Sequence, residues 1–383
     1  MSLEKTVYIL GAGFSSPAGG PAQDAILAEI WNLPDSASVE PHKNRLKDFL
    51  QNVLNVDETK VSLEDIYTPI DRCLADGIAL RGTGEEKLQE LRDSIGYLIA
   101  HAIKARFDRA STTSAGYVDA FAKHLVDLAA IRAEKAKGKT DAGEAKKYDP
   151  FSIISLNWDI LLDNALNTAL KAKDVRPDGS MMDGDYEPFG VVDYCCYISS
   201  VNAHEKRIRT GLWSLGCRGY NVKLLKIHGS MNWLQCPNCQ QLFVGFDEKF
   251  IIPNFSAPQP CRHCQKQGNV SNLRGSLVMP TFLKDLTNFQ VKLVWQNAAV
   301  EIMEARKLVF IGYSLPHADF EFRQLLSRMV HKDAKIKVVL WHGSDRYKEE
   351  CERYERFFSK HNPSFEPKGV LEFVRKLGAT TTP

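Results

Sequence analysis

Five short apolar runs constrain the fold of this chain more than any other feature of its sequence. Each run is nearly continuous in apolar, often β-branched residues, as in strands that are buried on both faces of a parallel sheet. Helix-like stretches separate the runs, and this alternation is typical of α/β folds. The runs are Thr6–Leu10, Phe151–Leu156, Val222–Ile227, Leu308–Gly312 and Ile336–Trp341. We therefore predict an α/β protein with a mostly parallel sheet.

Small and polar residues come at the end of each run. These clusters are Gly11–Ser16, Asn157–Asp159, His228–Ser230, Gly312–Ser314 and His342–Asp345. Ligands of open parallel sheets bind beyond the carboxyl ends of the strands. The clusters therefore predict a ligand site along one edge of a Rossmann-type sheet.

The chain between the first two predicted strands has a different pattern. Residues 23–147 carry apolar side chains at helical spacing, as in Leu46–Leu54 and Leu88–Ile99, and few strand signals. We predict an all-helical insertion there. Its charged end, Arg132–Tyr148, is interpreted as a solvated helix end and loop in preference to a nucleic-acid contact. The Rossmann-type domain would then comprise residues 1–22, 148–235 and 270–383.

The composition argues against several classes of function. The 383 residues include 49 Lys and Arg against 47 Asp and Glu, so the formal net charge is only +2. With 44% hydrophobic and 25% charged residues, the chain resembles neither a polybasic nucleic-acid-binding protein nor a disordered one. No run approaches the ~18 apolar residues of a membrane span, and the N-terminus resembles a strand more than a signal peptide. We expect a cytoplasmic protein with no membrane or nucleic-acid partner.

Four of the nine cysteines have the spacing of a metal site. They form two CxxC pairs, Cys236 with Cys239 and Cys261 with Cys264, separated by 21 residues. Two such turns present four thiolates to a tetrahedral Zn²⁺ ion and leave no open coordination position, so the zinc would be structural. Two disulfides or a redox CxxC are the alternatives. We predict a small zinc-binding module over residues 236–269, and interpret the remaining cysteines as buried small apolar residues.

The first polar cluster has glycines suited to a phosphate. Gly11 and Gly13 follow a buried strand, where glycines allow a tight turn and a close approach of backbone N–H groups to a pyrophosphate. Ser16 stands where the usual fingerprint has its third glycine, and no convincing acidic residue follows a second strand. The pattern favours nucleotide binding over a plain strand–turn, and it does not favour a dehydrogenase.

Taken in order, these motifs resemble the sirtuin-like (silent-information-regulator-like) family, in particular its divergent prokaryotic branch. The matching segments are Gly11–Ser15 (GAGFS), Ser155–Asp159 (SLNWD), Lys226–Trp233 (KIHGSMNW), the paired CxxC motifs and Phe310–Arg323 (FIGYSLPHADFEFR). They extend from the first strand to beyond Ser314, with the helical insertion as an addition.

The resemblance implies an enzyme that binds NAD⁺ between a Rossmann-type domain and a zinc-bearing lobe, and breaks the bond between nicotinamide and ribose. Its cofactor-binding residues would be Gly11, Ala12, Gly13, Phe14, Ser15, Gly312 and Ser314. Its catalytic residues would be Asn157 and Asp159 beside the nicotinamide ribose and His228 as general base.

Structural interpretations of the same residues stay open. A lone His-Gly after a strand is more often structural than catalytic. Asp159 is placed to cap a helix over Ile160–Leu170, and Asp319 to cap one over Phe320–Val330. His317 is expected on the surface.

Two departures from the family pattern suggest water as the acceptor. The Phe-Arg pair of protein-deacylating members is absent from Gly19–Gln23. Leu277–Phe282 replaces the strand that would hold a peptide, and Pro280 lacks the N–H needed for strand pairing. We therefore expect an NAD⁺ glycohydrolase, of the kind that the divergent branch uses in antiviral defence. A protein deacylase and a non-catalytic NAD⁺ or ADP-ribose sensor are the alternatives, and a homo-oligomer that gates activity is left open.

Overall fold

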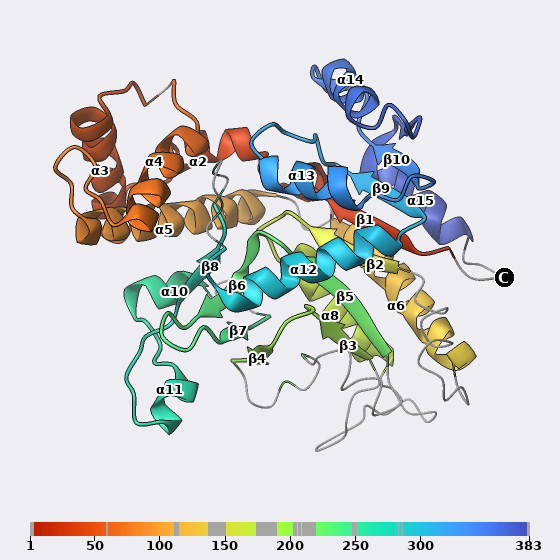
Figure 1. Ribbon diagram of the computed structural model, residues 1–383, viewed down its shortest axis with the longest axis horizontal. Coiled ribbons are helices and arrows are strands. Elements are labelled where there is room, and N and C mark those ends of the chain that lie inside the picture. The colour runs from red at the N-terminus through yellow and green to blue at the C-terminus, as the bar shows by residue number, and fades with distance from the viewer. Residues whose placement is uncertain are drawn as a thin grey trace.

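A seven-stranded sheet forms the centre of the larger lobe (Figure 1). The structure is a computed structural model, and it describes residues 4–58, 60–110, 115–136, 151–173, 190–201, 205, 208, 220–246, 251–279, 281, 284 and 286–380. All described neighbours in this sheet pair in parallel, in the order β11-β10-β9-β1-β2-β5-β3. The strands are β1 (Thr6–Leu10), β2 (Phe151–Ser155), β3 (Gly190–Asp193), β5 (Tyr220–Lys226), β9 (Lys307–Ile311), β10 (Lys335–Val339) and β11 (Ser364–Glu366). The predicted fold class is confirmed.

The five predicted strands are the five inner strands of this sheet. The two missed strands, β3 and β11, lie at its two edges and have only four and three residues. β11 has the sequence Ser-Phe-Glu and is partly exposed, so it lacks the continuous apolar pattern of a strand buried on both faces.

The register of the strands brings the predicted polar clusters to one level. Leu10 pairs with both Ser155 and Ile311, Ser155 pairs with Lys226, and Ile311 pairs with Val339. The loops after these strands therefore leave the sheet side by side. From β1 the sheet extends through β2, β5 and β3 on one side and through β9, β10 and β11 on the other. The strand order therefore reverses between β1 and β9, and open α/β sheets bind ligands at such a topological switch point.

Helices cover both faces of the sheet. On one face α6 contacts both α8 and α15, and α12 and α13 lie together on the other face with α14 (Figure 1). Their bounds are α6 (Gly116–Ala136), α8 (Leu161–Lys173), α12 (Phe289–Glu304), α13 (Phe320–Met329), α14 (Tyr347–Phe357) and α15 (Gly369–Thr380). The result is a three-layer α/β/α lobe with its core on both sides of the strands.

The predicted helical insertion is helical in the structure and shares a second core with the zinc-bearing segment. After the short α1 (Ala12–Ser15) its helices are α2 (Ile26–Trp31), α3 (Glu40–Asp48), a π-helical turn (Phe49–Leu54), α4 (Leu63–Asp76) and α5 (Glu85–Arg109). The middle of α5 is buried all round, and Tyr97 on it contacts Phe255 with 5.5 Å between ring centroids. Helices and zinc-bearing segment thus form one smaller lobe (Figure 1).

A second, four-stranded sheet belongs to this smaller lobe. Its order is β4-β7-β6-β8, with β6 antiparallel to both of its neighbours. Its elements are β4 (Ile198–Ser200), β6 (Gly229–Gln235), β7 (Leu242–Val244) and β8 (Arg274–Leu277), with the helices α10 (Ile251–Ser256) and α11 (Arg262–Lys266). The chain passes from the large sheet to the small one through Ile227 and His228, so His228 lies where the lobes meet.

The packing of α6 suggests an earlier end for the helical insertion. Its apolar residues, among them Phe121 and Leu125, belong to the core of the large sheet and not to that of the helices. We propose that the insertion ends near residue 110 and that α6 is the crossover helix between β1 and β2. Residues 137–148 of the charged segment, most of Gly179–Arg218, Pro280 and Phe282 lie outside the described residues. Within the described part of the chain, no helix has both the length and the apolar character to cross a membrane.

Candidate active site

Two glycine-containing loops meet at the switch point. The N–H of Gly13 donates to the carbonyl of Gly312 at 2.8 Å, and Gly312 has a φ of 60°. A Cβ on Gly13 would lie 2.8 Å from the Gly312 Cα, and one on Gly312 would lie 2.2 Å from the Gly13 carbonyl carbon. No side chain fits at either position, so the two glycines allow the loops to pack backbone against backbone.

These loops form one wall of a cavity of about 1420 Å³. Ligand cavities usually measure roughly 300–1,000 Å³, so this one is large enough for a dinucleotide. Every predicted catalytic or cofactor-binding residue lines it except Phe14 and Ser15. The helical insertion supplies the opposite wall, including Leu27 on α2 and Ile103 on α5. The cavity therefore lies between the sheet and the insertion.

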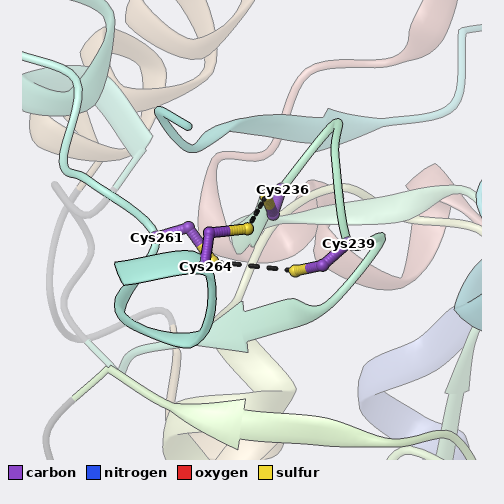
Figure 2. Close-up of side chains that lie close together, drawn as sticks. All are labelled: Cys236, Cys239, Cys261 and Cys264. Carbon is purple, nitrogen blue, oxygen red and sulfur yellow. Dashed lines mark hydrogen bonds between the residues drawn. The ribbon is translucent and has the colours of Figure 1, made fainter. Parts of the chain in front are cut away.

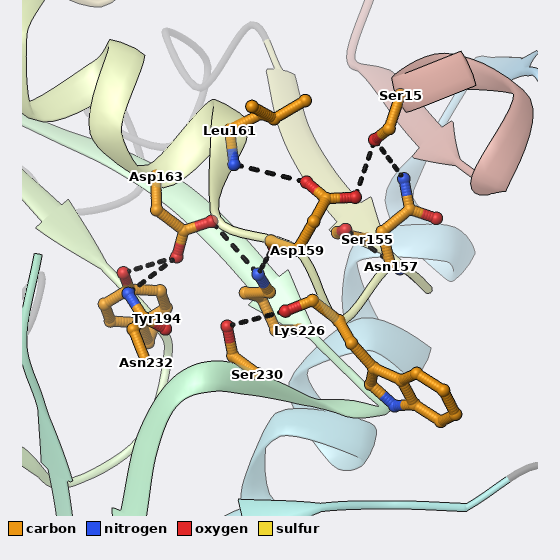
Figure 3. Close-up of polar contacts among 11 residues, drawn as sticks. Ser15, Ser155, Asn157, Asp159, Leu161, Asp163, Tyr194, Lys226, Ser230 and Asn232 are labelled. Carbon is orange, nitrogen blue, oxygen red and sulfur yellow. Dashed lines mark hydrogen bonds and ion pairs between the residues drawn. The ribbon is translucent and has the colours of Figure 1, made fainter. Parts of the chain in front are cut away.

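The structure places Phe14 and Ser15 behind the cavity wall. Phe14 is buried and meets Tyr117 edge-on, with 5.7 Å between ring centroids, so it anchors the glycine loop to α6. The Ser15 hydroxyl donates to Asp159 Oδ2 at 2.6 Å and accepts from Asn157 Nδ2 at 3.2 Å (Figure 3). Ser15 therefore orients two predicted catalytic side chains.

Asn157 and Asp159 are held by the loop after β1. The Asn157 amide also donates to the carbonyl of Gly11 at 2.9 Å. Asp159 Oδ1 accepts from the N–H of Leu161 at 3.2 Å, so the carboxylate also caps the start of α8, as its position in the sequence predicts (Figure 3). Burial raises the pKa of Asp159, against the opposing effect of the nearby Lys226 charge. Asp159 thus both caps α8 and lines the cavity.

A buried lysine, Lys226, holds the backbone of this loop in place. The Lys226 ammonium donates to the main-chain carbonyl of Asp159 at 2.5 Å and pairs with Asp163 at 3.0 Å (Figure 3). Asp163 also accepts from the Tyr194 hydroxyl at 2.7 Å and from Asn232 at 3.4 Å. Because Asn232 lies on β6 of the small sheet, this network connects the cavity wall to the second lobe.

His228 is oriented as a neutral base. Its Nδ1 lies 3.1 Å from the carbonyl oxygen of Leu156, which can only accept, so Nδ1 carries the proton and Nε2 has a free lone pair. Burial lowers the pKa of His228 to about 4, and the charge of Lys284 acts in the same direction while Asp319 opposes it. The indole N–H of Trp158 donates to the His228 carbonyl at 3.0 Å and fixes the backbone. The imidazole is therefore neutral at neutral pH, with its single proton on Nδ1.

Sequence reasoning missed two groups beside this histidine. Asp319 Oδ1 lies 3.6 Å from His228 Nε2 and 3.2 Å from Lys284 Nζ. The prediction that Asp319 caps α13 is wrong for its side chain, which accepts instead from the Tyr313 hydroxyl at 3.0 Å. Asp319 comes eight residues after the end of β9, so the strand-end rule could have identified it. Lys284 gave no signal, whereas His317 is exposed as expected.

The four paired cysteines come together in the smaller lobe. Their sulfur atoms all lie within 4.8 Å of one another, with Cys236 and Cys264 3.6 Å apart and Cys239 and Cys261 3.7 Å apart (Figure 2). A disulfide needs about 2.05 Å, whereas Zn–S bonds of about 2.3 Å in a tetrahedron separate sulfurs by about 3.8 Å. The donor set therefore fits a structural zinc ion, which would join the β6–β7 turn to α11.

Comparison with known proteins gives no match to a protein-family model and none to a curated protein. Among solved structures, the chain is similar to a complex of a Sir2 homologue with NAD, at 14% identity and a TM-score of 0.43, over 98% of this chain and 88% of that one. A Sir2 enzyme structure matches at 12% identity and a TM-score of 0.39, over 98% and 91% of the two chains. A complex of Sir2 with a p53 peptide and NAD⁺ matches at 15% identity and a TM-score of 0.36, over 98% and 92%. The assignment of the site rests on its own geometry.

Proposed function

We propose that this chain is a sirtuin-like, NAD⁺-consuming enzyme, and that it hydrolyses the bond between nicotinamide and ribose to release nicotinamide and ADP-ribose. The observation that carries the proposal is His228, which lines a dinucleotide-sized cavity and whose Nδ1 is committed to the Leu156 carbonyl. No residue in the described part of the chain forms a hydrogen bond with this Nε2. Nε2 of His228 is thus unprotonated and free to accept a proton.

The chemistry of the reaction requires little more than this. Cleavage of an N-glycosidic bond develops positive charge on the ribose, as in glycoside hydrolysis. Nicotinamide leaves as a neutral molecule, so no acid is needed to protonate it. The Asp159 carboxylate is suited to stabilise the developing cation, and Asn157 to orient a ribose hydroxyl. Gly11, Gly13 and Gly312 line the cavity, so their backbone is placed to hold the pyrophosphate and the adenosine side.

The segment after β8 favours hydrolysis over deacylation. A peptide substrate would need free backbone groups there to pair as an added strand. Leu277, Val278 and Met279 are buried. The N–H of Val278 donates to the His228 carbonyl at 2.9 Å, and its own carbonyl accepts from Trp158 at 3.2 Å. A peptide would have to displace both bonds, which supports water as the acceptor.

Two further parts of the proposal rest on other grounds. We place the enzyme in a reducing cytoplasm because the eight described cysteines form no disulfide. A role in antiviral defence is suggested by the resemblance of the motifs to the divergent branch of the family.

The test is incubation of the full chain with NAD⁺, with and without an acetylated peptide, followed by identification of the products by mass spectrometry. We expect nicotinamide and ADP-ribose in both cases. O-acetyl-ADP-ribose formed only with peptide would establish a deacylase instead, and tight binding without turnover would establish a sensor. His228→Ala and Asn157→Ala should each lower turnover by at least about 10²-fold. His317→Ala is the control, because His317 is exposed and does not line the cavity.

A further inference from the structure

Three buried, charged or basic side chains from separate segments meet at one edge of the candidate site. His228 follows β5, Asp319 precedes α13, and Lys284 lies between β8 and α12. Their side chains are 8%, 4% and 0% exposed. Asp319 Oδ1 is the centre of the group, 3.6 Å from His228 Nε2 and 3.2 Å from Lys284 Nζ.

The hydrogen bonding of the polar atoms that face one another here is incomplete. His228 Nε2, Asp319 Oδ1 and Lys284 Nζ each lack a hydrogen bond to any residue that the structure describes. The other oxygen of Asp319 is occupied by the Tyr313 hydroxyl at 3.0 Å, which fixes the direction of Oδ1. Lys284 Nζ and Asp319 Oδ1 form an ion pair, whereas His228 Nε2 has no hydrogen-bond partner among the described residues. Because buried polar atoms are usually hydrogen-bonded, the incomplete bonding of this group indicates a bound polar species.

The donor pattern identifies that species. A neutral His228 offers an acceptor at Nε2, the Asp319 carboxylate offers a second, and the Lys284 ammonium offers a donor. Water complements this set, since it donates twice and accepts, whereas a single hydroxyl group donates only once. Burial raises the pKa of Asp319, but its neighbours His228, Lys284 and Tyr313 bring that pKa below the usual value, so the carboxylate remains an acceptor at neutral pH.

We propose that His228, Asp319 and Lys284 together bind the water molecule that attacks the ribose. The inference rests on the proposed function and extends it by two catalytic residues, Asp319 and Lys284. In the step, one O–H bond of the water breaks and its proton goes to His228 Nε2. The water oxygen bonds to the anomeric carbon of the ribose. The bond from that carbon to nicotinamide breaks, and its electron pair stays on the pyridine nitrogen, which becomes neutral.

The position of the three atoms agrees with such a role. His228 and Asp319 line the cavity, and Asn157 and Asp159 line the same cavity on the loop after β2. Lys284 is fully buried and does not line the cavity, so it can donate to a water beside Asp319 without blocking the approach of substrate. Two of the three residues thus belong to the cavity wall.

A structure of the ligand-free protein at high resolution tests the water site without any need for activity. We expect one ordered water within hydrogen-bond distance of His228 Nε2, Asp319 Oδ1 and Lys284 Nζ. In Asp319→Asn this water should be lost or displaced. If the wild-type density shows no water among the three atoms, the proposal is overturned.

Kinetics test whether that water is the nucleophile. Asp319→Asn and Lys284→Met should lower kcat for NAD⁺ cleavage by about 10²-fold and leave KM within about threefold, because the residues contact the water and not the dinucleotide. A raised KM with an unchanged kcat would assign the cluster to a ribose hydroxyl and overturn the proposal. Asp333→Asn, an exposed aspartate in a surface turn, is the control.

Alcohol competition gives a readout that a merely structural role would not change. With methanol present, the ratio of methyl-ADP-ribose to ADP-ribose should rise in Asp319→Asn relative to wild type. Water has two O–H groups and can donate to both His228 and Asp319, whereas methanol has one, so loss of the Asp319 carboxylate removes the preference for water. An unchanged ratio in a folded variant contradicts the proposal. If the wild-type protein cleaves no NAD⁺ at all, the proposed function fails, and the ligand-free structure still decides whether the water site exists.

Discussion

The N–H of Gly13 donates a 2.8 Å hydrogen bond to the carbonyl of Gly312, and this contact joins the loops that follow β1 and β9. These two strands are neighbours in the sheet although their residues lie some 300 positions apart in the chain. The site thus lies at the topological switch point between β1 and β9, beside the two loops that pack against each other through Gly13 and Gly312.

We predict that Gly312→Ala destabilises the protein by about 2–4 kcal/mol. The substitution forces an alanine into a φ of 60° and places its Cβ 2.2 Å from the Gly13 carbonyl carbon. Gly77→Ala is a matched control, because Gly77 has a φ of 65° but nothing within 4 Å of an added Cβ. It should cost only about 1 kcal/mol. Urea unfolding of both variants checks this, and equal losses would show that the contact with Gly13 does not matter.

The sequence predicted the inner sheet well because those strands are buried on both faces and bear a continuous apolar pattern. The glycine loops and the cysteine pairs were also identifiable, since tight turns and tetrahedral metal sites impose strict residue types and spacings. The edge strand β11 was missed because its residues are partly exposed and only one side of it pairs.

The rest of the site depends on contacts that no local pattern records. The place of Lys284 in the site depends on its ion pair with Asp319, a residue 35 positions away in the chain. Phe14 looked like part of a binding loop, yet it points into the core against Tyr117. Lys226 offered a further signal, because a lysine at the end of a largely apolar strand requires a partner where it is buried.

We predict that the protein binds one zinc ion per chain. Cys264→Ser should lose most of the metal and lower the midpoint of thermal unfolding by several degrees, because the ion joins two turns of the smaller lobe. Elemental analysis of the purified protein measures the zinc content. Cys351→Ser, outside the cluster, should retain the metal. A wild-type protein free of zinc, or a Cys264→Ser variant with a full complement, would refute the assignment.

The ion pair between Lys226 and Asp163 should matter for stability as well as for the site. Lys226→Met leaves Asp163 buried and unpaired, which typically costs about 3–5 kcal/mol. The double variant Lys226→Met/Asp163→Asn should recover a large part of this loss, since position 163 no longer carries an unpaired charge. Lys123→Met removes an exposed pair with Asp127 and should cost less than about 1 kcal/mol. Chemical unfolding of the four proteins tests the prediction, and a double variant no more stable than Lys226→Met would contradict it.

The pH dependence of turnover should reveal the environment of His228. An ordinary histidine loses its base form as the pH falls through about 6.5. In the folded protein burial lowers the pKa of His228 to about 4, with Lys284 acting in the same direction, so the neutral, active form persists above that value and is lost as the pH falls through it. The acid limb of kcat/KM, which reports the free enzyme, should therefore lie near pH 4. His317→Ala should leave the profile unchanged. An inflection near pH 6.5, in protein that circular dichroism shows to be folded, would mean that His228 is solvated and that the buried base is not the catalytic one.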